Sequence, residues 1–183
     1  MNTVFSGKTY VTGDNTTAYK ISFNTRWKEC GTDEQALGQW LFEPIIPEIA
    51  GVPNGFKSMG SEVVVSGVDF GGGFKSNDHP VLTLKGAGIK LLIAEKFNRI
   101  FFRNAINLGV PVITCPGILK MAHNGDILEG DIATGVVTNR TTGIVLQGQP
   151  LSELALELEA AGGLLPYWKA KLTKGAASGG EAG

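Results

Sequence analysis

Three short apolar runs, separated by two segments with helical character, constrain the fold of this chain most strongly. The runs cover residues 63–65, 91–94 and 110–113. Fully apolar runs of this length are typical of strands buried on both faces of a sheet. The segments between them, residues 80–88 and 100–109, are predicted helices that end at glycines. Strands joined through helices run parallel with right-handed crossovers, so the sequence predicts an α/β fold with a small parallel sheet.

The region before the first apolar run predicts a hairpin and a helix. Residues 4–11 alternate in type and residues 19–23 are rich in strand-forming side chains, so we expect two strands around a turn at residues 13–15. Residues 32–35 read Thr-Asp-Glu-Gln, a capping-box pattern. They predict a helix that runs to about Pro44, followed by a proline- and glycine-rich loop.

The region after the third apolar run has a different pattern. Residues 126–147 read as short strands broken by glycine-containing turns, which predicts an antiparallel meander. Residues 151–161 carry leucines at helical spacing, and Gly162 follows them. We therefore predict one domain over residues 1–174 and a disordered tail over residues 175–183, where small residues dominate.

Composition excludes several classes of function. The formal net charge of the 183 residues is −1, so no basic surface favours nucleic-acid binding. The sequence contains no apolar run of the roughly 18–20 residues that a membrane span needs, and no basic-then-apolar leader at its start. We therefore expect a cytoplasmic protein.

The chain has two cysteines, Cys30 and Cys115. Two thiols at this separation form neither a disulfide framework nor a CxxC metal motif. They also cannot hold a 4Fe–4S cluster, which takes about four thiolates. We interpret both as reduced, buried thiols.

Several blocks of sequence, in the same order, resemble one known family. Gly13-Asp14-Asn15 resembles its opening GDN, and residues 65–73 resemble its strand and glycine loop. Residues 93–101 are similar to its "IA-x-SFA-x-IF" block, and residues 139–143 to its closing strands. The family is that of the small subunit of isopropylmalate isomerase and the swivelling domain of aconitases. The resemblance covers roughly residues 4 to 172.

This resemblance implies a three-layer β/β/α swivelling domain with a C-terminal antiparallel meander. It also implies one half of a heteromeric hydro-lyase that acts on a small hydroxy-acid or related carboxylate. The partner would be a large subunit that carries a 4Fe–4S cluster, in agreement with the shortage of cysteines here. An isolated small subunit can form a homodimer through the surface meant for its partner.

The glycine loop keeps the length of the family loop but changes its contents. In the family, Ser-Ser-Arg-Glu-His follows the glycines, with a serine as the base and the arginine on a substrate carboxylate. Here Phe74 and Lys75 replace the serines, Ser76 replaces the arginine, and His79 stands one place after the histidine position. Thr17-Ala18-Tyr19 likewise replaces an Asp-Thr-Asp after the GDN turn.

Candidate site residues follow from this loop. Glycines turn backbone N–H groups toward an anion, and the loop leads into a helix N-terminus, which also favours anions. We therefore predict Ser76 and His79 as catalytic residues. The predicted substrate-binding residues are Gly72, Gly73, Phe74, Lys75 and Arg26.

Each of these side chains also has a structural interpretation. Ser76 is suited to capping the following helix. Lys75 can be solvated and His79 can pack. Trp27 is interpreted as a core or interface residue.

Two functions remain open on the sequence alone. The first is the hydro-lyase subunit, with a substrate other than citrate or isopropylmalate because the arginine fork is missing. The second is a non-catalytic, stand-alone swivelling domain that binds a carboxylate or phosphate. A neighbouring gene for a large subunit with three spaced cysteines would distinguish them.

Overall fold

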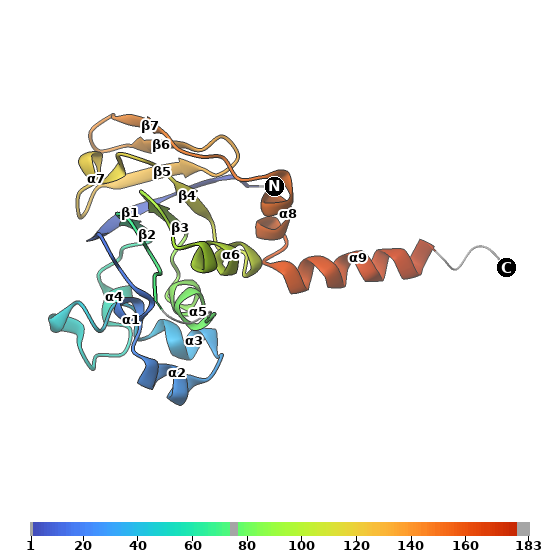
Figure 1. Cartoon of the computed structure of the whole chain (residues 1–183), viewed down its shortest axis with the longest axis horizontal. Coiled ribbons are helices and arrows are strands. Elements are labelled where there is room, and N and C mark those ends of the chain that lie inside the picture. The colour runs from blue at the N-terminus through green and yellow to red at the C-terminus, as the bar shows by residue number, and fades with distance from the viewer. Residues whose placement is uncertain (1, 74–76, 179–183) are drawn as a thin grey trace.

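A computed structural model describes residues 2–73 and 77–178 and shows three layers. A layer of helices covers one face of the parallel half of a curled sheet, and the antiparallel half lies on the other face (Figure 1). This is the β/β/α arrangement expected from the sequence.

The sheet has seven strands in the order β4-β3-β2-β1-β5-β6-β7. Strand β1 is central: it runs parallel to β2 and antiparallel to β5. Strands β2, β3 and β4 pair in parallel, and β5, β6 and β7 form the predicted antiparallel meander. The strands are β1 (Val4–Gly13), β2 (Val63–Ser66), β3 (Leu91–Ala94), β4 (Val112–Thr114), β5 (Ile127–Asp131), β6 (Val136–Asn139) and β7 (Val145–Gln147).

Strand β4 begins two residues later than predicted. The N–H of Val110 donates to the carbonyl of Ala105 at 2.9 Å and so ends the preceding helix. Pro111 has no N–H to donate to a neighbouring strand. The ladder with β3 therefore starts at Val112.

The predicted strand at residues 19–23 is wrong. These residues lie largely in the short helix α1 (Ala18–Ile21). A hairpin strand needs a free edge of β1, but β2 and β5 already occupy both edges. The chain instead turns away from the sheet, and Ile21 is fully buried beneath the helices.

The helix predicted to run to Pro44 is shorter. It is α3 (Glu34–Gly38), and Asp33 caps it by accepting a hydrogen bond from the N–H of Ala36 at 3.0 Å. The backbone of Gly38 lies against that of Gly86, since a Cβ added to Gly38 would stand 2.1 Å from the Gly86 carbonyl carbon. The remaining helices are α2 (Asn24–Cys30), η1 (Pro47–Ile49), α4 (Gly55–Ser58), α5 (His79–Gly86), α6 (Arg99–Asn107), α7 (Ile118–Met121), α8 (Glu153–Ala160) and α9 (Leu164–Ser178).

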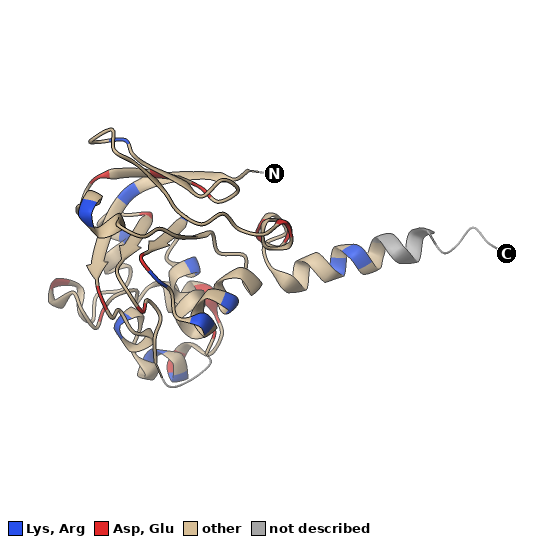
Figure 2. Ribbon diagram, turned by 45° about the horizontal axis from the view of Figure 1, so that its top comes forward, with Lys and Arg blue, Asp and Glu red and all other residues tan. Residues whose placement is uncertain are grey.

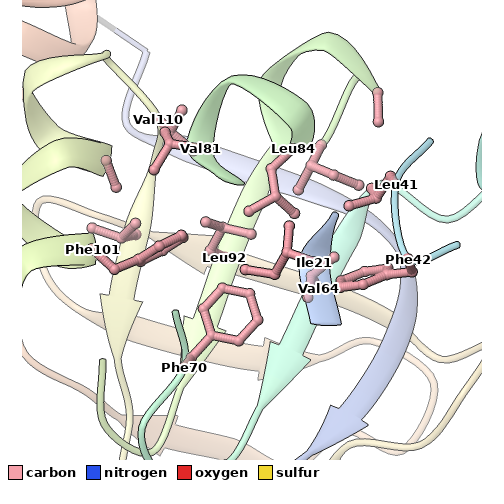
Figure 3. Close-up of a cluster of buried hydrophobic side chains, with 14 of the residues drawn as sticks. Ile21, Leu41, Phe42, Val64, Phe70, Val81, Leu84, Leu92, Phe101 and Val110 are labelled. Atoms are coloured by element: carbon pink, nitrogen blue, oxygen red, sulfur yellow. The ribbon is translucent and has the colours of Figure 1, made fainter. Parts of the chain in front are cut away.

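Alternate residues of the parallel strands enter two separate cores. Val64 and Leu92 pack against α1, α5 and α6 together with Phe70 and Phe101 (Figure 3). Their neighbours along the strands, Ile93 among them, face the antiparallel half of the sheet. Both faces of these strands are thus buried, which explains their continuous apolar sequence.

The C-terminal helix α9 projects away from the body of the molecule and carries basic but no acidic residues (Figure 2). The predicted tail begins inside this helix, because α9 continues to Ser178. Residues 179–183 lie outside the described residues, so their disorder stays a prediction. Within the described ranges, no helix has the length and apolar character to cross a membrane.

The two ends of the sheet meet at one backbone bridge. The N–H of Gln149, just after β7, donates to the carbonyl of Thr114 at 2.8 Å. Gly148 allows this approach because a Cβ there would lie 2.7 Å from the same carbonyl oxygen. The bridge gives the curled sheet a nearly closed outline.

Replacing Gly148 by alanine should therefore destabilise the fold. We expect Gly148→Ala to lower the free energy of unfolding by about 1–3 kcal/mol, as overpacking does. Urea denaturation measures this change. Val145→Ala, on an exposed position of β7, is the control and should change stability by less than about 0.5 kcal/mol. Equal stability of the two variants would contradict the close approach.

Candidate active site

The glycine loop follows β2 and occupies the carboxyl end of the parallel strands. Gly71 has a φ of +77°, and a Cβ there would lie 2.1 Å from Cγ of Phe101. Both facts restrict this position to glycine. The loop therefore lies directly on α6.

The GDN turn at residues 13–15 holds the loop in place. Asp14 Oδ1 accepts a hydrogen bond from the N–H of Val68 at 2.8 Å. The N–H of Gly71 donates to the carbonyl of Thr16, and the N–H of Ala18 donates to the carbonyl of Gly72, both at 2.8 Å. The two segments thus form one hydrogen-bonded unit.

The predicted site residues of the loop divide into two groups. Phe74, Lys75 and Ser76 lie outside the described residues, so their roles stay predictions. Gly72 is buried and uses its N–H within the loop, donating to the carbonyl of Asp69 at 3.2 Å. Gly73 is exposed, and a Cβ there would meet only Ala18, at 3.8 Å.

His79 begins α5, and its hydrogen bonds with Asn77 favour one tautomer of its ring. The backbone N–H of His79 donates to Asn77 Oδ1 at 2.9 Å, which identifies the facing atom as oxygen rather than amide nitrogen. The same Oδ1 is hydrogen-bonded to His79 Nδ1. Because this oxygen can only accept, the contact requires the proton on Nδ1. In that tautomer of the neutral ring, Nε2 has the lone pair that a proton acceptor requires.

The Trp27 ring stacks on both His79 and Tyr19. Its centre lies 5.4 Å from that of His79 at an interplanar angle of 22°, and 5.4 Å from that of Tyr19 at an angle of 19°. Tyr19 and Trp27 come from the neighbouring helices α1 and α2, whereas His79 comes from α5, some fifty residues later in the sequence. The buried Nε1 of Trp27 has no hydrogen-bond partner among the described residues. The stack restricts the His79 ring.

Arg26 is engaged by protein groups. Its guanidinium donates to both carboxylate oxygens of Glu43, at 2.7 and 3.0 Å, and to Glu29 at 2.9 Å. It also lies 3.6 Å above the centre of the Trp40 ring. These contacts fix α2, and hence the neighbouring Trp27. Substrate binding by Arg26 stays a prediction.

Glu43 is nearly buried, with 7% of its surface exposed. The hydrogen bonds from Arg26 hold the pKa of this carboxyl below its usual range, against the opposing effect of burial, and the N–H of Gly51 adds a further donor at 3.0 Å. Sequence reasoning missed this pair because Arg26 and Glu43 follow no helical or strand spacing.

The cysteines show no sign of reactivity. Burial raises the pKa of the Cys115 thiol to about 11, and burial also raises the pKa of Cys30. Among the described residues, no group of three or more His, Cys, Asp or Glu side chains could hold a metal ion.

Comparison with known proteins gives a consistent match. Residues 12–116 match the model of the aconitase C-terminal domain. The chain is 46% identical over 138 residues to the 3-isopropylmalate dehydratase small subunit of Pyrobaculum calidifontis, covering 75% of this chain and 81% of that protein. It is 50% identical over 113 residues to the isopropylmalate/citramalate isomerase small subunit of Methanocaldococcus jannaschii, covering 62% and 67%.

A solved structure supports the fold. The crystal structure of a 3-isopropylmalate dehydratase from Methanocaldococcus jannaschii superposes with a TM-score of 0.81 at 28% identity. The superposition covers 96% of this chain and 99% of that one. The predicted swivelling-domain fold is therefore confirmed.

The tautomer of His79 can be measured directly, because the chain has only two histidines. We expect long-range ¹⁵N–¹H NMR to show His79 protonated on Nδ1, and His123→Gln assigns the signals. Asn77→Ala should move the proton toward Nε2 because the acceptor is lost, whereas Asn77→Asp should keep it on Nδ1. A wild-type ring protonated on Nε2 would contradict the geometry.

The Arg26–Glu43 pair predicts a pH-dependent contribution to stability. We expect Glu43→Gln to lower the free energy of unfolding at pH 7 by about 3 kcal/mol, since it breaks a largely buried pair. Because the folded-state pKa of Glu43 is lowered, the stabilisation is present above the unfolded pKa of about 4.3 and is lost as the pH falls through the folded value.

Urea denaturation of wild type and variant at pH 7 and near pH 3 measures this difference. The two unfolding free energies should converge at the lower pH. Glu48→Gln, the same change on an exposed residue five positions away, is the control and should have little effect at either pH. If Glu43→Gln lowers the free energy of unfolding by the same amount at both pH values, the ion pair is not the source of that loss.

Proposed function

Because this chain belongs to the aconitase C-terminal domain family, and within it to the small subunits of 3-isopropylmalate dehydratase, we propose that it is one half of a heteromeric hydro-lyase. It would act on a small hydroxy-acid or related carboxylate. The observation that carries this proposal is the glycine loop, which the GDN turn holds by hydrogen bonds at the carboxyl end of the parallel strands.

The chemistry proposed for this chain is proton transfer and carboxylate binding. His79 would accept a proton on Nε2, since Asn77 keeps Nδ1 protonated. Ser76 would be the second catalytic residue, and Lys75 would bind a substrate carboxylate as a point charge. Gly73, where a side chain would meet little, lets a ligand approach the backbone.

We further propose that the substrate differs from isopropylmalate at the group that the family arginine binds. The loop has no arginine between Gly71 and Pro80, so a bidentate fork for that carboxylate is missing. The Tyr19–Trp27–His79 stack adds flat apolar surface beside the loop. A substrate with an apolar or uncharged group at this position fits both changes.

The partner would be a large subunit that carries the 4Fe–4S cluster. The residues of this chain do not fit such a cluster: it has two cysteines, and their raised pKa values disfavour the thiolate form that binds iron. The names of the relatives as small subunits support a second chain.

Co-expression with a large subunit from the same genome tests the proposal. We expect a stable complex after anaerobic purification, with iron and sulfide that the isolated chain lacks. The complex should dehydrate a hydroxy-acid, and the absorbance of the unsaturated product follows the reaction. A chain that purifies alone, without partner or iron, would overturn the hydro-lyase proposal and leave only ligand binding.

Variants of the complex then test the roles proposed for the loop residues. Ser76→Ala and His79→Gln should each lower kcat by about 100-fold or more, the usual effect of losing a general acid or base. Lys75→Ala should mainly raise KM. Lys85→Ala is the matched control, because Lys85 lies at the other end of α5 and pairs with Glu34. Normal kinetics for all three loop variants would contradict the assigned roles.

A further inference from the structure

A cavity of about 540 Å³ opens at the carboxyl ends of β3 and β4. Three segments form it: the turn after β3, the first half of α6, and the bridge between Thr114 and Gln149 that closes the sheet. Its volume is within the range of small-molecule sites. The lining includes Lys96, Phe97, Arg99, Phe102, Arg103 and Gln149.

Three cations line this cavity. Lys96, Arg99 and Arg103 are exposed, and in the described part of the chain none of them takes part in an ion pair. The one carboxylate in the lining, Glu95, is engaged elsewhere. It accepts hydrogen bonds from the N–H groups of Gly117 at 2.6 Å and Leu119 at 3.2 Å.

The positions of the two arginines are unfavourable for α6 itself. Arg99 occupies the first turn, where the helix dipole repels positive charge. Arg103 follows at i+4, so the two like charges lie on one face of the helix. The helix contains no acidic residue to offset them. A bound anion would relieve both repulsions.

Apolar surface lies beside these charges. Phe97 is 7% exposed, and its ring packs at 5.9 Å from that of Phe70 and at 5.8 Å from that of Phe102. Phe102 is partly exposed to the cavity. The cavity is thus lined by aromatic rings as well as by cations. This combination suits a ligand in which an anionic group is attached to an apolar group.

We propose that this cavity binds the carboxylate of a small organic acid, at a site separate from the glycine loop. Lys96, Arg99 and Arg103 bind the carboxylate, Phe97 and Phe102 contact the apolar part, and Gln149 offers an amide. The site adjoins the segment that leads into the loop: Phe97 packs on Phe70, and the Asn98 amide donates to Asp69 at 3.3 Å. Binding is independent of the proposed dehydratase activity.

Titration of the full ¹⁵N-labelled chain with benzoate, benzamide and inorganic phosphate tests the site. We expect benzoate to shift the amide signals of Phe102 and Gln149 in a saturable way. Benzamide, which has the same shape without the charge, should bind at least tenfold more weakly. Phosphate, which lacks an apolar body, should also bind more weakly than benzoate.

Matched variants localise the effect. The double variant Arg99→Gln/Arg103→Gln should weaken benzoate binding at least tenfold. Arg140→Gln removes a cation that is paired with Glu129 on the antiparallel half of the sheet and should leave binding unchanged. Equal binding of benzoate and benzamide, or an equal loss in both variants, would overturn the proposal. These measurements need no large subunit, so their failure leaves the hydro-lyase proposal untouched.

The assembled complex distinguishes two sources of the carboxylate. If the ligand is a free organic acid, benzoate still binds to the complex with the large subunit. If an Asp or Glu of the large subunit fills the cavity, benzoate competes with assembly and the double variant assembles more weakly. Either result supports carboxylate recognition. Assembly and benzoate binding that are both insensitive to the double variant would contradict it.

Discussion

Strand β1 is hydrogen-bonded along both edges, and the rest of the structure depends on this. Its parallel partner β2 begins the half of the sheet that the helices cover, and its antiparallel partner β5 begins the meander. Because parallel strands end at the same edge, the register that pairs Gly13 with Ser66 brings the GDN turn beside the glycine loop. The candidate active site is therefore a consequence of how one strand is paired.

The layers of the fold were predictable because each parallel strand is apolar on both faces. The sequence could not reveal that β1 has no free edge, so residues 19–23 were expected to form a strand and instead form most of α1. It also could not reveal that Phe42 has a φ of +57° and donates its N–H to the carbonyl of Ile21 at 2.9 Å, so the chain after α3 continues in turns rather than as a helix to Pro44. Both errors concern contacts between segments that are distant in the chain, and local patterns carry no record of such contacts.

The position of the glycine loop was predictable, but the contacts around it were not. The glycines and the helix that follows them marked the loop, and His79 begins that helix, while its catalytic role stays a prediction. The surrounding stack was missed because Tyr19, Trp27 and His79 come from three helices, and an aromatic residue in a short helix is usually a core residue. Arg26 was singled out for a substrate, and the structure pairs it with Glu43. An arginine alone does not indicate which carboxylate it meets.

The contacts that hold the glycine loop also bear on how this fold acquires new specificities. Gly71 lies against Phe101, Val68 is bound by Asp14, and the α5 end is tied to α6 where Asn104 donates to the carbonyl of Asn77 at 3.2 Å. These anchoring residues lie on either side of residues 74–76 in the sequence, and none of them is one of the three positions that differ from the family pattern. Residues that anchor the loop and residues that differ in it are therefore distinct sets. Selection can act on one set without changing any member of the other.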